Sequence, residues 1–173
     1  ALTPIAMVSL PPLHDYPKYL GRLHVMARCG DSSDLQRFYE PGWAPVPSLA
    51  WDVFGAALSR VVSEESAGRL FLALVVLLLV TGTVAVHRAL HGRWSAWPLL
   101  GFLFVYNLIF LLGFLNYLCG VGLFLWCFAA WVRYREAPFL PRLVGFALAP
   151  IVLLGAHVTA LGLHGLATFG YEI

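Results

Sequence analysis

Residues 97–132 form a run of 36 residues that contains no charged side chain. Such a run would aggregate in water, whereas in a lipid bilayer it is typical of an inserted segment. The whole chain agrees with this interpretation, because 60% of its 173 residues are hydrophobic and only 12% are charged, against roughly 25% charged residues in a soluble domain. The sequence therefore predicts an all-α, polytopic transmembrane protein.

The hydrophobic pattern predicts about four spans, near residues 70–87, 97–112, 118–133 and 143–164. As one straight helix the uncharged run would reach about 54 Å, against a hydrocarbon core of roughly 30 Å. We therefore expect a helical hairpin with a break inside residues 113–120, where Asn116 satisfies the freed backbone groups. Ser63, followed by two glutamates, predicts a helix start. Pro150 predicts a kink in the fourth span.

The chain divides into residues 1–69, expected to be extracytoplasmic or interfacial, and a transmembrane bundle over residues 70–173. Residues 1–10 are too short to span a bilayer and are similar to the last turns of a longer hydrophobic segment. A short amphipathic surface helix is expected around residues 17–28 and a second over residues 49–62, with Ser48 as its cap. Residues 41–47 predict an extended connector. Trp43 and Trp51 are expected at the depth of the lipid headgroups.

The arginines predict the orientation. The two short connections, residues 87–96 and 133–142, hold five arginines and one acidic residue, whereas residues 1–69 hold six basic and seven acidic residues. The positive-inside rule places the two connections in the cytoplasm and residues 11–69, Asn116 and the C-terminus outside. Basic residues form no large cluster, which argues against a nucleic-acid partner; the expected partners are the lipid bilayer and other membrane subunits.

Residues 10–22 (LPPLHDYPKYLGR) resemble a signature of large bacterial inner-membrane proteins similar to the GT-C class of membrane glycosyltransferases. Further similar stretches are residues 67–72, 97–100, 106–107 and 113–117. The resemblance implies a bacterial inner-membrane location, a polyprenyl-phosphate sugar as substrate and Asp15 as the base that deprotonates the acceptor hydroxyl. The chain departs from the family pattern at Tyr19, where the family has histidine. It also lacks a full first span and many later spans, which predicts a shortened relative or a fragment.

Asp15 has a second interpretation, as the N-cap of the helix that begins near Pro17. We favour the cap, because capping requires no other residue, whereas catalysis requires partners that the sequence does not reveal.

Polar residues within the apolar spans need a partner or a water-lined cavity. His157 is a candidate ligand of haem or chlorin, although an interhelical hydrogen bond is the favoured explanation. His164 is expected at the outer interface. The three cysteines fit no metal motif, so no metal site is predicted; buried free thiols are favoured over a bridge between Cys29 and Cys119.

Small residues recur along one side of the fourth predicted span, which permits close helix packing in lipid. From this face we predict a non-catalytic accessory or assembly subunit of a larger bacterial membrane complex, bioenergetic or light-harvesting in kind. The alternative is a shortened GT-C-like glycosyltransferase. The residues of this predicted packing face are Gly145, Ala149, Val152, Ala156 and Ala160.

Overall fold

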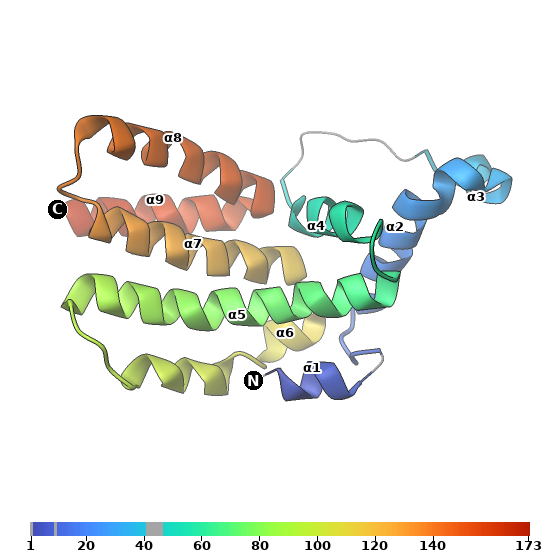
Figure 1. Ribbon diagram of the computed structural model, residues 1–173, viewed down its shortest axis with the longest axis horizontal. Coiled ribbons are helices and arrows are strands. Elements are labelled where there is room, and N and C mark those ends of the chain that lie inside the picture. Colours follow the sequence, from blue (N-terminus) through green and yellow to red (C-terminus); the bar gives the residue numbers. More distant parts are fainter. Residues whose placement is uncertain (1, 9, 41–46) are drawn as a thin grey trace.

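The computed structural model describes residues 2–8, 10–40 and 47–173, and within these ranges the chain is helical and contains no β-strand (Figure 1). This confirms the predicted all-α class. The helices are α1 (Thr3–Met7), α2 (Tyr16–Arg28), η1 (Cys29–Asp31), α3 (Ser33–Phe38), α4 (Ala50–Leu58), α5 (Glu64–His91), η2 (Trp97–Phe104), α6 (Leu108–Leu112), α7 (Leu115–Arg133), α8 (Phe139–Ala156) and α9 (Val158–Glu172).

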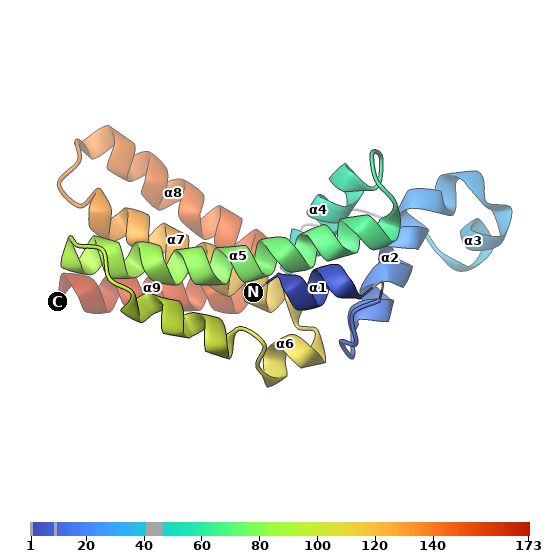
Figure 2. The ribbon, with the colours of Figure 1, turned by 60° about the horizontal axis from the view of Figure 1, so that its bottom comes forward.

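Helices α5 and α7 form the frame of the molecule and are long and apolar enough to cross a membrane. The side chain of Ser63 accepts a hydrogen bond from the Ser66 amide (3.3 Å), as the sequence predicts for the start of α5. Gly92, with φ of 68°, ends α5 in the left-handed conformation that glycine adopts without strain. The two helices run in the same direction along the bundle, and η2 and α6, which connect them in the sequence, run back in the opposite direction (Figures 1 and 2).

The predicted break in the uncharged run is found at Gly113, whose φ of 84° separates α6 from α7. Residues 97–112 are not one continuous α-helix. They form the 3-10 helix η2 and then α6, which begins where Asn107 Oδ1 accepts a hydrogen bond from the Phe110 amide (3.0 Å). The asparagine therefore restarts the helix by offering a side-chain cap.

The prediction of a single fourth span over residues 143–164 is wrong, because the chain turns at His157 and forms two antiparallel helices, α8 and α9 (Figure 1). Helix α8 continues through Pro150. His157 has extended backbone angles, and its Nδ1 accepts a hydrogen bond from the Thr159 amide (3.3 Å), so the histidine caps a new helix.

This extra turn returns the C-terminus to the end of the bundle that holds the arginine-rich connection. Glu172 accepts hydrogen bonds from Arg135 Nη2 (3.3 Å) and from Trp131 Nε1 (3.0 Å). The expectation that the C-terminus lies at the same end as Asn116 is therefore wrong.

Helices α2 and α4 pack on each other and on the first turns of α5 at the opposite end, and α4 also contacts α7 (Figure 2). Helices α2 and α4 confirm the two predicted short helices. Trp51 is 1% exposed, and its ring lies between those of Tyr19 (5.1 Å between centroids) and Phe71 (5.2 Å). It is a core residue rather than the headgroup anchor that we expected, because α4 packs its aromatic side against α2 and α5. Trp43 and most of the predicted connector lie outside the described residues.

Candidate functional site

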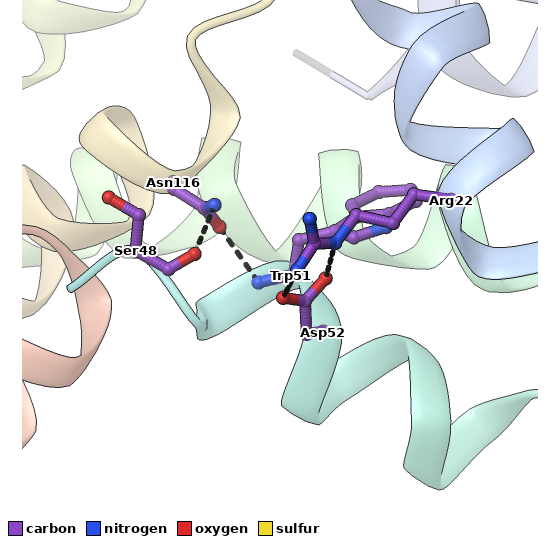
Figure 3. A network of polar contacts seen from close by, with 5 residues as sticks. All are labelled: Arg22, Ser48, Trp51, Asp52 and Asn116. Atoms are coloured by element: carbon purple, nitrogen blue, oxygen red, sulfur yellow. Dashed lines mark hydrogen bonds and ion pairs between the residues drawn. The ribbon is translucent and has the colours of Figure 1, made fainter. Parts of the chain in front are cut away.

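The candidate site is a group of polar residues where α2, α4 and the start of α7 meet, which we call the polar cluster. Its members are Asp15, Arg22, Ser48, Asp52 and Asn116; Figure 3 shows the last four together with Trp51. These residues lie far apart in the sequence, and most of the interactions between them join different helices.

Asp15 is held in place by its backbone. The amides of His14 and Asp15 donate hydrogen bonds to the carbonyls of Leu111 (3.0 Å) and Leu112 (3.2 Å) at the end of α6. A Cβ atom on Gly113 would lie 3.1 Å from the Asp15 nitrogen, so this close approach favours glycine. The helix break thus positions the residue that the resemblance implies as the base.

The prediction that the Asp15 side chain caps a helix is wrong. Asp15 occupies the N-cap position of α2, but its side chain accepts no capping hydrogen bond. A capping residue needs an extended backbone to bring its oxygen over the next amides, whereas Asp15 already has helical angles (φ −89°, ψ −3°). Its half-buried carboxylate forms no ion pair with any described residue.

Arg22 and Asp52 form the strongest ion pair of the cluster. Arg22 Nε and Nη2 each donate a hydrogen bond of 2.7 Å to one carboxylate oxygen of Asp52. The side chain of Asp52 is 5% exposed, whereas that of Arg22 is 58% exposed. The hydrogen bonds to Asp52 are the main cause that raises the pKa of the Arg22 guanidinium, and burial partly opposes them. The pair therefore joins α2 to α4 and leaves part of the guanidinium accessible.

Asn116 joins α7 to the segment before α4. Its Nδ2 donates to the Ser48 carbonyl (2.7 Å), and its Oδ1 accepts from the Trp51 amide (2.8 Å). The N-cap residue of α4 is Leu49, which offers no side-chain bond, so the asparagine supplies the missing cap from another helix. The expected roles of Ser48 as this cap and of Asn116 at the hairpin break are therefore both wrong.

Two tyrosines of α2, Tyr16 and Tyr19, lie next to the cluster. Burial is the main cause that raises the pKa of Tyr19; a hydrogen bond with the Asn116 backbone lowers it, and the charges of Asp15 and Asp52 raise it further. Burial raises the pKa of Tyr16 to about 12. The Tyr16 hydroxyl is buried and has no hydrogen-bond partner among the described residues. Both tyrosines therefore stay neutral near pH 7.

In chemical terms, the cluster offers the Asp15 carboxylate, which has no hydrogen-bond partner among the described residues, and the accessible cation of Arg22 on the same helix. Asp15 and Arg22 are seven residues apart, or two helical turns, which corresponds to about 10.5 Å along the axis. Asp52 has its charge satisfied by Arg22 and cannot serve as a free base. Sequence reasoning missed the pairing of Arg22 with Asp52, since no spacing rule connects positions 30 residues apart on different helices.

His157, the candidate haem or chlorin ligand, lies at the turn between α8 and α9. Its Nδ1 is 2.7 Å from Thr159 Oγ1, and its ring packs edge-on against Tyr117 (5.5 Å between centroids). His164 is buried at 6% exposure rather than placed at an interface. In the part of the chain that the structure describes, no group of three or more histidines, cysteines or acidic residues could hold a metal ion. The three cysteines are free thiols.

The predicted packing face is divided between two helices. Gly145 of α8 is exposed, and a Cβ atom there would meet nothing within 4 Å. Ala149 is half-buried, and both residues line a cavity of about 490 Å³ between α7 and the last two helices. Ala156 and Ala160 are buried, and a Cβ atom on Gly120 of α7 would lie 3.0 Å from that of Ala160. Only Ala156 and Ala160, in the second half of the predicted packing face, therefore pack closely.

A close approach between the long helices involves two glycines that sequence reasoning missed. A Cβ atom on Gly122 of α7 would lie 2.6 Å from the Cβ atom of Leu78, and one on Gly82 of α5 would lie 2.8 Å from that of Leu125. Small residues permit such contacts between apolar helices. The sequence of either helix alone does not reveal this contact, because each glycine faces a larger residue on the other helix.

Comparison with known proteins assigns no family to this arrangement. No protein-family model, no curated protein and no solved structure matches the chain. The functional argument therefore depends on the residues of the polar cluster and on their geometry.

Proposed function

We propose that this protein is a GT-C-like glycosyltransferase of the bacterial inner membrane, with Asp15 as its catalytic base. The observation that carries the proposal is Asp15, whose backbone is held by hydrogen bonds to α6 and whose carboxylate is not used as a helix cap. A carboxylate that stabilises no local structure is available for proton transfer.

The same corrections weaken the accessory-subunit hypothesis that the sequence favoured. That hypothesis depended on Asp15 being a cap and on one continuous stripe of small residues. The side chain of Asp15 forms no capping bond, and the stripe is divided between α8 and α9.

The proposed membrane arrangement uses α5, η2 with α6, α7, α8 and α9 as successive crossings, with the polar cluster at the outer face. The inner end then holds Arg88, Arg93, Arg133, Arg135 and Arg142 against Glu136 and Glu172, which agrees with the positive-inside rule. Helices α2 and α4 lie at the outer surface, where a lipid-linked substrate can reach Asp15.

In the proposed reaction, Asp15 accepts the proton of an acceptor hydroxyl, whose oxygen then attacks the anomeric carbon of a polyprenyl-phosphate sugar. The bond between that carbon and the phosphate oxygen breaks, and polyprenyl phosphate leaves with the electron pair. The exposed part of the Arg22 guanidinium holds the phosphate, a role suited to the fork of donors that arginine presents.

The test is Asp15→Asn in the native cell, measured by mass spectrometry of polyprenyl-phosphate sugars in membrane extracts. Loss of a base costs typically about 100- to 10,000-fold in rate, so the lipid-linked sugar should accumulate while protein level and helicity stay normal. The matched control is Asp34→Asn, which changes an exposed carboxylate in the first turn of α3. Unchanged levels of every polyprenyl-phosphate sugar in the Asp15 variant would refute the proposal.

The second candidate is the accessory subunit, and exposed Gly145 favours it, because a neighbouring helix could approach α8 closely there. For this role Gly145→Leu should release partner subunits during purification in mild detergent, whereas Asp15→Asn should not. Ligation of haem or chlorin by His157 stays a prediction, and an absorbance spectrum of the purified protein tests it.

A further inference from the structure

A large groove lies at the inner end of the bundle, at the opposite end of the molecule's long axis from the polar cluster. It is formed by the last turns of α5, by η2 and by the last turns of α7, and its volume is about 1040 Å³. Ala85, Trp94, Phe102 and Trp126 are among the apolar residues that line it. Figure 1 shows that α5 and α7 both end here, next to the C-terminus.

Two arginines from different helices line this groove. Arg88 lies in the last turn of α5, and its Cζ atom is 4.6 Å from the centre of the Trp94 ring. Arg133 is the last residue of α7. Both are exposed, and neither pairs with a carboxylate among the described residues. No acidic side chain is among the described residues that line the groove.

The combination of apolar walls with unpaired cations points to an amphiphilic anion. Arginines at helix ends also counteract the helix dipole, but that role does not require two of them on one apolar groove. Basic pockets between membrane helices are known to hold the head groups of anionic lipids. Tryptophans such as Trp94 and Trp126 suit the boundary between chain and head group.

We propose that this groove binds one anionic glycerophospholipid, with its phosphate held by Arg88 and Arg133 and an acyl chain along Ala85, Phe102 and Trp126. The site is separate from the polar cluster and does not depend on the proposed glycosyl transfer. It requires only that the two connections at this end meet a lipid head group.

The test is native mass spectrometry of the full chain in detergent, titrated with phosphatidylglycerol or with zwitterionic phosphatidylcholine. We expect one phosphatidylglycerol to be retained in preference to phosphatidylcholine. Arg88→Gln and Arg133→Gln should each weaken its binding about five-fold, which corresponds to about 1 kcal/mol per basic residue. The double variant should lose about 30-fold if the two contributions add. The control is Arg93→Gln, an exposed arginine of the same connection that does not line the groove.

A second variant tests the apolar part without altering charge. Ala85→Phe should block retention by filling the groove, whereas Ala149→Phe, in the cavity beside α8, should not. Equal retention of both lipids, or an equal loss with Arg93→Gln, would overturn the proposal. Preferential retention of polyprenyl phosphate over phosphatidylglycerol would likewise overturn the choice of ligand.

Discussion

The ion pair between Arg22 and Asp52 should respond very differently to the loss of each partner. Arg22→Met leaves the Asp52 carboxylate buried at 5% side-chain exposure without its two hydrogen bonds of 2.7 Å. Breaking a fully buried pair costs about 3–5 kcal/mol, and because Arg22 is 58% exposed we place the loss at about 3 kcal/mol. Asp52→Asn removes the charge instead and keeps an acceptor, so we expect about 1 kcal/mol.

The assay is thermal unfolding in mild detergent, followed by circular dichroism. For a domain of this size about 3 kcal/mol corresponds to a fall in Tm of about 6–12 °C. The control is Arg135→Met, which breaks an exposed pair with Glu172 (3.3 Å) and should cost less than about 1 kcal/mol. If Arg22→Met is no more damaging than Arg135→Met, or if Asp52→Asn is the more damaging of the two cluster variants, the reasoning is wrong.

Three further predictions test packing, burial and topology. Gly122→Ala should lower the free energy of unfolding by about 1–3 kcal/mol through overpacking. Gly162→Ala, where a Cβ atom meets nothing within 4 Å, should instead raise it by up to about 1 kcal/mol. Equal effects of the two substitutions would contradict the close contact at Gly122. Burial raises the pKa of folded Tyr16 from 10.0 to about 12, whereas the tyrosine of the unfolded chain ionises near 10. The free energy of unfolding should therefore fall faster between pH 10 and 12 in the wild type than in Tyr16→Phe. Parallel curves of unfolding free energy against pH would argue against this burial. In whole cells an impermeant thiol reagent should label Ser32→Cys and not Glu172→Cys in a background without native cysteines, and the reverse pattern would invert the proposed orientation.

Much of the helical structure was predictable, because apolar runs and caps are local signals. Ser63 marks the start of α5, and the excess length of the uncharged run required the break found at Gly113. The short helices α2 and α4 also follow from local amphipathic patterns. These predictions hold because a helix is specified by residues within a few turns of each other.

The polar cluster was not predictable in the same way. Asn116 was correctly chosen as a polar residue that needs partners, but its partners are backbone groups of Ser48 and Trp51, more than 60 residues away in the sequence. Asp15 was assigned as a cap from its position before α2. Its helical backbone angles, set by the hydrogen bonds to α6, prevent that role. Contacts between helices therefore decided what each polar side chain does.

The start of a new helix at His157 determines the topology of the whole C-terminal part. A proline inside an apolar run suggests where a helix weakens, yet α8 continues through Pro150 and the chain turns at His157. An apolar membrane helix tolerates a proline when neighbouring groups satisfy the freed carbonyl, whereas a side chain that caps the following amides starts a new helix. The chain reverses direction at His157, between α8 and α9. Glu172 therefore lies next to Arg135, and the C-terminus does not lie at the end of the bundle that holds Asn116. The end of the bundle at which the C-terminus lies thus depends on one histidine cap, which is why the arginine pattern alone placed it at the end that holds Asn116.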